Sequence, residues 1–572
     1  MQMRKKVLSV VIASSMIMSL AACGGSTSSN TAAGANKSQT KTSTTASAAA
    51  GSTAAADDSG LIDGKFAETK HIKVEVYDRS IDGGSDVTNN AYTDYIKKGM
   101  LEDHNVEVEF VAVPRWTEVE QINNLLAAGT APDLCVTYDK ATIDTYSAMG
   151  GVIDMADYVT KYKDQLPNLW SWLGETNIYW DQDPTTGTLY DIETKLANQN
   201  HLNTFIRKDW LDKLGLAEPK TKDEFYKVLC AFRDNAQTLL GDNADKLIPY
   251  SVSYDVGWRA GTLIESFIDP DLSDKDGYVY GFDDRKVTYP GTKDAIKTLN
   301  KWYNEGLMWK DFALYGSGDS TEDDMMKAGY VGAFTHNWDY PYRNGTDSIQ
   351  ASLIRTVGED AKFIAIDPFE DSKGTHTKWI SGPVDRKVFF PTTNKEPLAC
   401  LLYLDWLSQP EHIEYLQIGE EGVTHKTLDN GAVQILTASG NDIQNSGFNI
   451  DYTLTCNGLH LTDDNKTTLS IAYSYAEVDP ELVELAYNVA KVDTREGKNA
   501  KCGTISAETG MTETLNSKRD ILFDTSVSAS TDEFDSVFDS AMTDYLQSGG
   551  QAIIDERKSA WEKVYGDETN LK

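Results

Sequence analysis

The stretch HIKVEVY at residues 71–77 opens the part of the chain that decides its fold. The runs VEVEFVAV at residues 106–113 and DLCVTY at residues 133–138 follow it, and all three have the alternating or apolar pattern typical of β-strands. The segments between them, residues 92–102 and 117–129, have a helical spacing of apolar residues. A strand–helix–strand–helix–strand order is typical of a parallel sheet covered by helices. The sequence therefore predicts an α/β fold.

The whole chain is long and strongly acidic. It has 572 residues and a formal net charge of −35. From residue 61 onward roughly 510 residues remain, which is enough for two or more packed domains. An acidic surface of this strength argues against binding nucleic acid and against holding an anionic membrane by charge, and it suits an exported protein. After the N-terminal segment no apolar run reaches the length of a membrane span, so we do not expect the body of the chain to be a membrane domain.

The N-terminus has the pattern of an export signal. Basic residues within the first six positions precede a mostly apolar run at residues 7–20. The sequence LAAC at residues 20–23 resembles a bacterial lipobox, in which the cysteine is lipidated. We therefore expect residues 1–22 to be a lipoprotein signal peptide, and lipidated Cys23 to hold the protein at the outer face of the membrane of a Gram-positive cell. An ordinary signal peptide with an incidental cysteine is the alternative. Residues 23–60 are rich in Ser, Thr, Ala and Gly, which predicts a disordered tether.

Signals for metal-dependent or catalytic chemistry are weak. No zinc-type Cys/His spacing and no known catalytic motif occurs, and adjacent acids are expected by chance in so acidic a chain. Residues 269–277 partly match a calcium loop, but Leu272 holds the position of the first carboxylate. An acidic surface turn is the preferred interpretation, and bound calcium is the alternative. We expect no cofactor and no metal site. Cys456 and Cys502 are the pair considered for a disulfide.

Several separated segments, in a fixed order, resemble one known family. They are VPRW at 113–116, LLAAGTAPDL at 125–134, residues 207–225, WYNEGL at 302–307, KAGYVGAF at 327–334, LDWLS at 404–408 and GEEGV at 419–423. Together they are similar to the extracellular solute-binding lipoproteins of bacterial ABC importers, in the carbohydrate-binding, family 1-like branch for aldouronate- or oligosaccharide-type solutes. The resemblance implies a two-lobed, periplasmic-binding-protein-like (type II) clamshell with a hinge and a C-terminal helical extension.

The resemblance also suggests domain boundaries. Lobe 1 is expected to hold residues 61–200 and 375–420. Lobe 2 is expected to hold residues 201–374 together with residues 421–572, which include the C-terminal helices. Ligands of this family bind in the cleft between the lobes, as expected for sites at lobe interfaces.

Aromatic residues beside polar ones in predicted loops are the candidates for ligand binding. A sugar ring has an apolar face that Trp and Tyr planes match, and an equator of hydroxyls that Asp, Asn and Arg match. For each tryptophan the alternative is packing in the core, and Trp210, Trp302 and Trp406 lie on helical stripes that predict such packing. The candidate ligand-binding residues are Asp78, Arg79, Trp116, Asp139, Trp180, Trp258, Arg259, Asn337, Trp338 and Trp379.

These observations predict a lipid-anchored solute-binding protein and not an enzyme. We expect a monomer whose lobes close around a carbohydrate, a plant-type oligosaccharide, and deliver it to the permease subunits of an ABC importer. Arg79, Arg259 and Arg386 are the basic residues that could accommodate an acidic sugar. A surface polysaccharide hydrolase, which needs a carboxylate pair facing across the cleft, is one alternative. An adhesive glycan-binding surface protein is the other.

Overall fold

The computed structural model describes residues 59–571 with the exception of Asp82, Ser317, Ser381, Thr437 and Ala476. The expected signal peptide, Cys23 and all but the last two residues of the expected tether lie outside the described residues. The described residues belong to one packed unit. Within it, no helix is both long enough and apolar enough to cross a membrane.

The first lobe begins with the parallel strands that the sequence predicts. β3 (Lys70–Asp78) pairs in parallel with β4 (Val106–Pro114) along its whole length, and α1 (Ala91–His104) connects them. Helix α1 begins where the Asn90 side chain accepts hydrogen bonds from two backbone N–H groups of the first turn. After α2 (Glu118–Ala128) the chain returns to β3 through a parallel bridge. This arrangement confirms the predicted parallel α/β fold.

A second set of strands extends this lobe with segments from distant parts of the chain. β12 (Val384–Phe389) lies between β5 (Cys135–Thr137) and β6 (Ile192–Leu196) and is antiparallel to both. β15 (Cys456–Asn457) pairs in parallel with β6, and the Tyr452 ring just before it packs in the core of this lobe. Strand β15 thus differs from the expected boundaries, which assign the whole segment after residue 420 to the second lobe.

The core of the first lobe is closed by two helices. α15 (Pro397–Leu407) is apolar on almost every side, and it is buried along nearly its whole length. Its Trp406 is 1% exposed, which confirms the predicted core position. The carboxylate of Asp405 accepts hydrogen bonds from backbone N–H groups at the start of α5 (Pro167–Ile178), so the two helices are fixed to each other.

The second lobe has its own four-stranded sheet. β7 (Leu202–Arg207) and β9 (Val331–Asn337) form its centre, with β10 (Phe363–Ile366) beside β7 and β8 (Ile248–Ser251) beside β9. β7 is antiparallel to β9 and β10, whereas β8 is parallel to β9. Almost every residue of these strands is buried, because helices pack against the sheet.

Two amphipathic helices supply much of the second core. α7 (Lys222–Asp234) begins at Thr221, whose hydroxyl accepts a hydrogen bond from the first turn, and it buries one apolar face. α12 (Thr292–Asn304) carries Trp302 into the same core. Trp302 and Trp210 are each 2% exposed, which confirms the predicted core positions.

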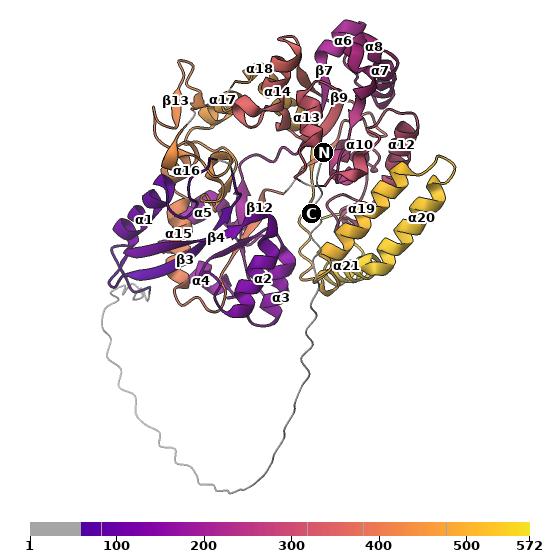
Figure 1. The fold of residues 1–572 in the computed structure, drawn as a ribbon. Helices are drawn as coiled ribbons and strands as arrows, with labels where there is room; N and C mark the ends of the chain where they lie inside the picture. The colour runs from indigo at the N-terminus through magenta and orange to yellow at the C-terminus, as the bar shows by residue number, and fades with distance from the viewer. Residues whose placement is uncertain are drawn as a thin grey trace, which may run out of the picture. The chain divides into compact units, whose positions relative to one another are not determined.

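The C-terminal extension is helical and joins the second lobe. α19 (Thr512–Ser528), α20 (Phe534–Tyr545) and α21 (Gln551–Tyr565) contribute apolar side chains to the second core. α19 packs against both α12 and α20, and in Figure 1 the yellow helices α19 and α20 lie beside α12. The Asn300 side chain of α12 donates hydrogen bonds to backbone carbonyls at the end of α19.

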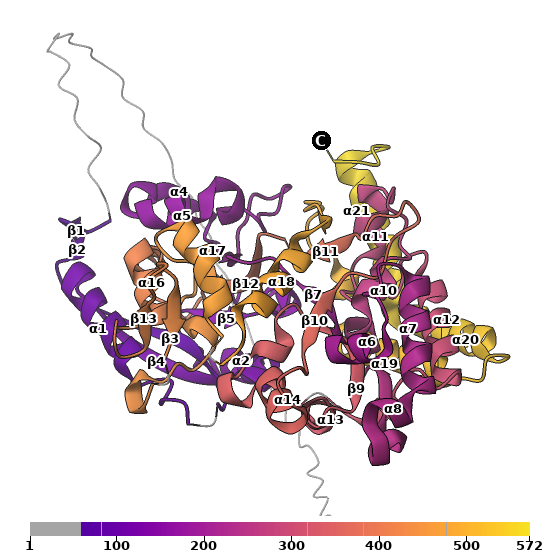
Figure 2. The same cartoon turned by 90° about the horizontal axis from the view of Figure 1, so that it is seen from above.

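The chain passes from the first sheet to the second between β6 and β7, returns between β10 and β12, and passes to the second lobe again after β15. Figure 2 shows α18, in orange, beside β10 of the second lobe. The remaining strands and α-helices are β1 (Leu61–Ile62), β2 (Lys65–Phe66), α3 (Lys140–Ala148), α4 (Ala156–Lys161), α6 (Lys208–Leu214), α8 (Ala236–Leu240), α9 (Val256–Arg259), α10 (Gly261–Glu265), α11 (Asp274–Tyr280), α13 (Thr321–Lys327), α14 (Ile349–Val357), β11 (Lys378–Ile380), α16 (Pro410–Ile418), β13 (His425–Thr427), β14 (Val433–Ile435), α17 (Asp464–Tyr473), α18 (Pro480–Lys491) and β16 (Thr494–Glu496).

Candidate functional site

A cavity of about 760 Å³ lies where the two lobes face each other. We call it the cleft. Its first wall comes from β6, β12 and the segment after α5, and comprises Trp180, Glu193, Asp385 and Lys387. Its second wall comes from the second lobe and comprises His201, Trp258, Asp283, Asp284, Arg285, Lys286, Trp379 and Arg495. Cavities of this size at a lobe interface are the usual place for a small-molecule site.

Trp258 stands at the centre of the second wall. It lies on α9, which begins at Asp255, whose side chain accepts a hydrogen bond from the Trp258 backbone N–H at 3.1 Å. The His201 ring meets the indole edge-on, with ring centres 4.5 Å apart. Burial, reinforced by the charges of Lys286 and Arg285, lowers the pKa of His201 to about 3, so this imidazole is neutral. The indole is therefore held on one side and borders the cleft on the other.

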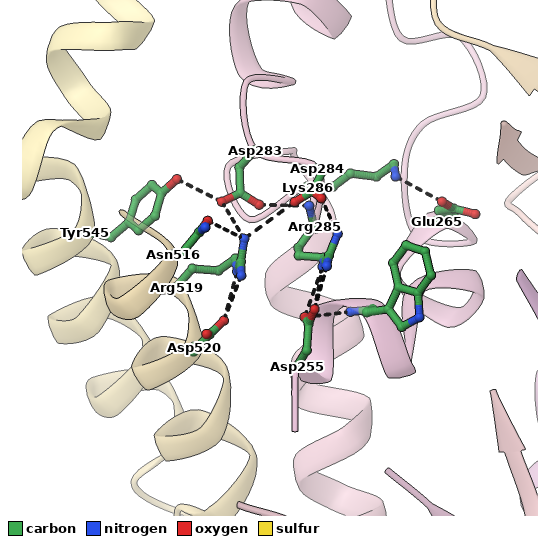
Figure 3. A network of polar contacts seen from close by, with 11 residues as sticks. Asp255, Glu265, Asp283, Asp284, Arg285, Lys286, Asn516, Arg519, Asp520 and Tyr545 are labelled. Carbon is green, nitrogen blue, oxygen red and sulfur yellow. Dashed lines mark hydrogen bonds and ion pairs between the residues drawn. The ribbon is translucent and has the colours of Figure 1, made fainter. Parts of the chain in front are cut away.

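A charged network fixes the loop that carries the second wall. The guanidinium of Arg285 donates to Asp255 at 2.6 and 2.9 Å and lies 4.8 Å from the centre of the Trp258 ring. Figure 3 shows Arg519 and Tyr545 of the C-terminal helices meeting Asp283 from the other side. Burial raises the pKa of Asp283, while the charge of Arg519, 3.4 Å away, opposes that rise. The C-terminal extension thus positions a wall of the cleft.

Trp379 forms another part of the second wall. It lies on β11, which pairs in parallel with β16, and this register places Arg495 opposite it. The Arg495 guanidinium lies 4.5 Å from the centre of the Trp379 ring. The Trp379 backbone N–H donates to Glu265 at 3.2 Å, which connects β11 to α10. Because α10 packs against β7, the position of Trp379 is tied to the second sheet.

The first wall combines an indole with buried charges. A Cβ atom placed on Gly382 would lie 3.2 Å from the Trp180 ring, so the backbone there passes close to the indole. Lys387 on β12 lies 3.2 Å from Glu193 on β6. Burial alone would lower the pKa of Lys387, but the surrounding carboxylates hold it above its ordinary value, so this lysine is charged.

A second cavity of about 540 Å³ borders Trp258 and Arg285, and we call it the side cavity. The predicted residue Asn337 lies here, at the end of β9. Asp524 of α19 lines it as well. Burial, together with the nearby carboxylates of Asp520 and Asp255, raises the pKa of Asp524 to about 7.

The structure thus brings four of the ten predicted residues to these two cavities: Trp180, Trp258 and Trp379 in the cleft and Asn337 in the side cavity. The other six predicted residues line neither of them. These are Asp78, Arg79, Trp116, Asp139, Arg259 and Trp338.

Four of these six lie in the first lobe. Arg79 donates two hydrogen bonds to Asp451, at 2.7 and 2.9 Å, and so ties the end of β3 to a distant loop. Asp78, its neighbour, accepts a hydrogen bond from a backbone N–H two residues ahead. Asp139 caps α3, and Trp116 is 73% exposed on a short turn before α2. An internal ion pair, a local turn hydrogen bond and a helix cap explain Arg79, Asp78 and Asp139, respectively, without a ligand.

The other two lie in the second core. Arg259 has no solvent exposure, because it pairs with Glu322 and donates to the carbonyl of Thr335. Trp338 packs against two tyrosine rings and is 8% exposed. Arg386, which the sequence offered for an acidic sugar, is also fully buried, 3.5 Å from Asp451. These side chains stabilise the lobes and do not face the cleft.

The cationic residues of the cleft were missed by the sequence reasoning. The charged run DDRK at residues 283–286 is a signal that could have found two of them. No local signal marks Arg495, because its place beside Trp379 depends on pairing between segments more than 110 residues apart. The cationic residues that line the cleft are Arg285, Lys286, Lys387, Arg495, Lys498 and Arg557.

The disulfide that the sequence suggested between Cys456 and Cys502 is not formed. Both residues are free thiols, and Cys456 lies buried on β15 beside β6.

The turn at residues 269–277 was the candidate calcium loop. In this turn, the side chain of Ser273 caps α11. Arg495 donates to the backbone carbonyls of that turn. The segment is therefore organised by a helix start and by an arginine.

A family model described as bacterial extracellular solute-binding protein matches residues 96–419, more than half of the chain. The chain belongs to this family. It is 26% identical over 331 residues to the polygalacturonan/rhamnogalacturonan-binding protein YtcQ of Bacillus subtilis (strain 168), covering 56% of this chain and 61% of that protein. It is 28% identical over 220 residues to the fructooligosaccharide ABC transporter substrate-binding protein FusA of Streptococcus pneumoniae, covering 34% of this chain and 39% of that protein. The chain thus spans less than two thirds of the length of these relatives.

Solved structures share the fold of this solute-binding protein. A crystal structure of the alginate-binding protein AlgQ2 without calcium ion matches 87% of this chain and 98% of its own, with 17% identity and a TM-score of 0.60. The S. pneumoniae FusA structure in complex with kestose matches 87% of this chain and 100% of its own, with 15% identity and a TM-score of 0.59. At these identities the likeness concerns the two-lobed fold alone.

Proposed function

We propose that this solute-binding protein captures an oligosaccharide in the cleft and delivers it to an ABC permease. The observation that carries the proposal is that Trp180, Trp258 and Trp379 border the same cavity from both lobes. Indole planes complement the C–H faces of sugar rings, and the charged groups between them complement hydroxyls. Closure of the lobes would place a sugar chain between the indoles and exclude water.

The names of related proteins support a carbohydrate as the solute. One relative is named for binding polygalacturonan and rhamnogalacturonan and another for fructooligosaccharides. Cationic side chains line both walls of the cleft, and Lys286 and Lys387 stand on opposite sides. We therefore propose a plant-type oligosaccharide and include acidic ones among the solutes to be tested.

Delivery of the solute to the permease would depend on closure of the two lobes and on attachment of the protein to the membrane. We propose that the crossings at residues 197–201 and 367–383 form the hinge, and that lipidation of Cys23 holds the protein at the outer face of the cell membrane. A flexible tether would keep the receptor at high local concentration near its permease while it captures solute. The protein would act as a monomer, because each chain carries both walls of the cleft.

We also propose that the protein binds its solute without cleaving it. Several of the carboxylates that line the cleft are held in ion pairs, among them Glu193 with Lys387 and Asp283 with Arg519. Incubation of the full chain with each bound oligosaccharide should release no new reducing ends. Release of reducing ends would identify a hydrolase instead.

Calorimetry of the full chain against oligogalacturonides, fructooligosaccharides, amino acids and peptides tests the main proposal. We expect at least one oligosaccharide to bind, and small-angle scattering to report compaction in its presence. Trp258→Ala should weaken that binding by about 2 kcal/mol, which is about 30-fold in Kd. Trp116→Ala is the matched control, because Trp116 is 73% exposed and lies outside the cleft. Binding of a peptide or an amino acid but of no sugar would overturn the proposal.

A further inference from the structure

A cluster of three carboxylates extends inward from the first wall, and only one of them, Glu193, lines the cleft. We call Asp181, Asp191 and Glu193 the acidic cluster. One carboxylate oxygen from each of the three lies within 4.8 Å of those of the other two. Asp181 directly follows Trp180, Asp191 directly precedes β6, and Glu193 is the second residue of β6. The cluster therefore joins the segment that carries the Trp180 indole to a strand of the first sheet.

Asp191 is buried without a donor for either of its oxygens. It is 1% exposed, and no described residue donates a hydrogen bond to its carboxylate or to Oδ2 of Asp181. The nearest cation is Lys140, whose Nζ lies 3.7 Å from Asp191 Oδ2, beyond hydrogen-bond distance. Because a buried carboxylate without donors is costly, this side chain points to a partner that the chain itself does not supply.

The neighbouring charges do not balance the cluster. Lys140 is also engaged by Asp144, and Lys387 is engaged by Glu193. These two ammonium groups face four carboxylates, so a net negative charge remains in a buried place.

We propose that the acidic cluster binds one calcium ion. The donors are all carboxylate oxygens, which suit a hard cation. Calcium holds oxygens at about 2.3–2.6 Å, so oxygens on opposite sides of the ion lie up to about 5 Å apart, which accommodates the spread of the three donors. Magnesium demands near-ideal octahedral geometry at about 2.0–2.1 Å and usually keeps several waters, so a site of three protein carboxylates suits it less well. Bidentate contacts and water complete the coordination.

The ion would act on the geometry of the cleft. It would fasten the segment after Trp180 to β6, whose Glu193 faces the solute, and so fix the indole of the first wall. Calcium binding at the acidic cluster requires no solute, so this inference goes beyond the proposed function. Each of the two can be tested without the other.

Titration of the chelator-treated full chain with calcium chloride tests the proposal. Calorimetry should report one site with a Kd between micromolar and millimolar, and magnesium should bind at least tenfold more weakly. Saturating calcium should raise Tm. Terbium, a calcium substitute, should luminesce on excitation of tryptophan, because Trp180 adjoins the site. A chain that binds no calcium at 5 mM would overturn the proposal.

Matched variants separate this site from the acidic surface of the protein. Asp191→Asn keeps the shape of the side chain and should weaken calcium binding at least tenfold and remove the rise in Tm. Glu193→Gln serves as a second variant and should also weaken binding. Asp539→Asn removes an exposed carboxylate from α20 and should leave calcium binding unchanged. Equal calcium binding by wild type, Asp191→Asn and Glu193→Gln would place the ion elsewhere and overturn the assignment.

Discussion

The two walls of the cleft are built on different kinds of structure. In the first wall, Glu193 and Lys387 lie opposite each other on the paired strands β6 and β12. In the second wall, Trp258 lies on a helix of four residues and Arg285 lies in a loop. Backbone ladders therefore position the first wall, whereas the second wall is positioned by side chains that reach it from elsewhere.

The contacts that hold the second wall are buried charges. Arg259, the residue after Trp258, pairs with Glu322 of α13 inside the lobe. Arg519 of α19 pairs with Asp283 beside the loop of Arg285. A backbone ladder tolerates the loss of one side chain, but a buried ion pair does not tolerate the loss of one partner. The second wall should therefore be the more sensitive of the two to single substitutions.

The largest expected effect is that of Glu322→Gln. Glu322 accepts hydrogen bonds from Arg259 and from the hydroxyls of Ser251 and Ser253. Burial alone would raise the pKa of Glu322, but these partners hold it below its ordinary value, so the carboxylate is charged. The amide would leave a guanidinium with no solvent exposure uncompensated. We expect the free energy of unfolding to fall by about 3–5 kcal/mol in urea titrations.

A double variant sharpens this test. Arg259→Met combined with Glu322→Leu removes both charges and should recover at least half of the loss, because neither partner is then left unpaired in the core. A cost below about 1 kcal/mol for Glu322→Gln would show that the second wall does not depend on this pair.

A contrast between local patterns and long-range contacts explains how much of the fold could be predicted from the sequence. The strands at residues 71–77 and 106–113 and the helix between them were predictable, because their apolar periodicity is local. The core positions of Trp210, Trp302 and Trp406 were predictable for the same reason. The strand β15 was not, since its two residues pair with β6 across more than 250 positions of sequence.

The candidate site was less predictable than the fold. Trp180, Trp258 and Trp379 could be selected because aromatic residues in polar loops stand out from the helical stripes. Arg259, the residue directly after Trp258, looked equivalent to it in the sequence, but the four-residue helix α9 turns the two side chains in different directions. Which side chain faces the cleft thus depends on tertiary contacts that no local pattern records.

A smaller effect is expected at the side cavity, which borders the second wall. The pKa of Asp524 is raised to about 7 by burial and by the carboxylates of Asp520 and Asp255, against 3.8 for an ordinary Asp. The folded chain then binds a proton that the unfolded chain has lost, so this group makes stability fall as pH rises from about 4 to about 7. Asp524→Asn should remove the part of this pH-dependent loss of stability that Asp524 causes.

Urea midpoints at pH 4.5 and pH 8 measure this difference. Asp524 is half-buried, and solvent screening reduces the expected gain of Asp524→Asn at pH 8 to about 1–2 kcal/mol relative to pH 4.5. Asp539→Asn, at an exposed carboxylate of α20, should leave the pH dependence unchanged. An identical pH dependence for wild type and Asp524→Asn would mean that the side cavity does not hold this carboxyl away from water.

The smallest expected effect comes from the neighbour of Arg519 on the same helix. Lys518 lies 2.7 Å from Asp544 and joins α19 to α20, but both side chains are largely solvated. Lys518→Ala should change the free energy of unfolding by no more than about 0.5 kcal/mol, and less at high salt, because exposed ion pairs are weak. Arg519→Ala, one position away, should cost at least about 2 kcal/mol, since it leaves the buried Asp283 without its cation. Equal costs for the two substitutions would mean that α19 supports the second wall through packing alone and not through the charge of Arg519.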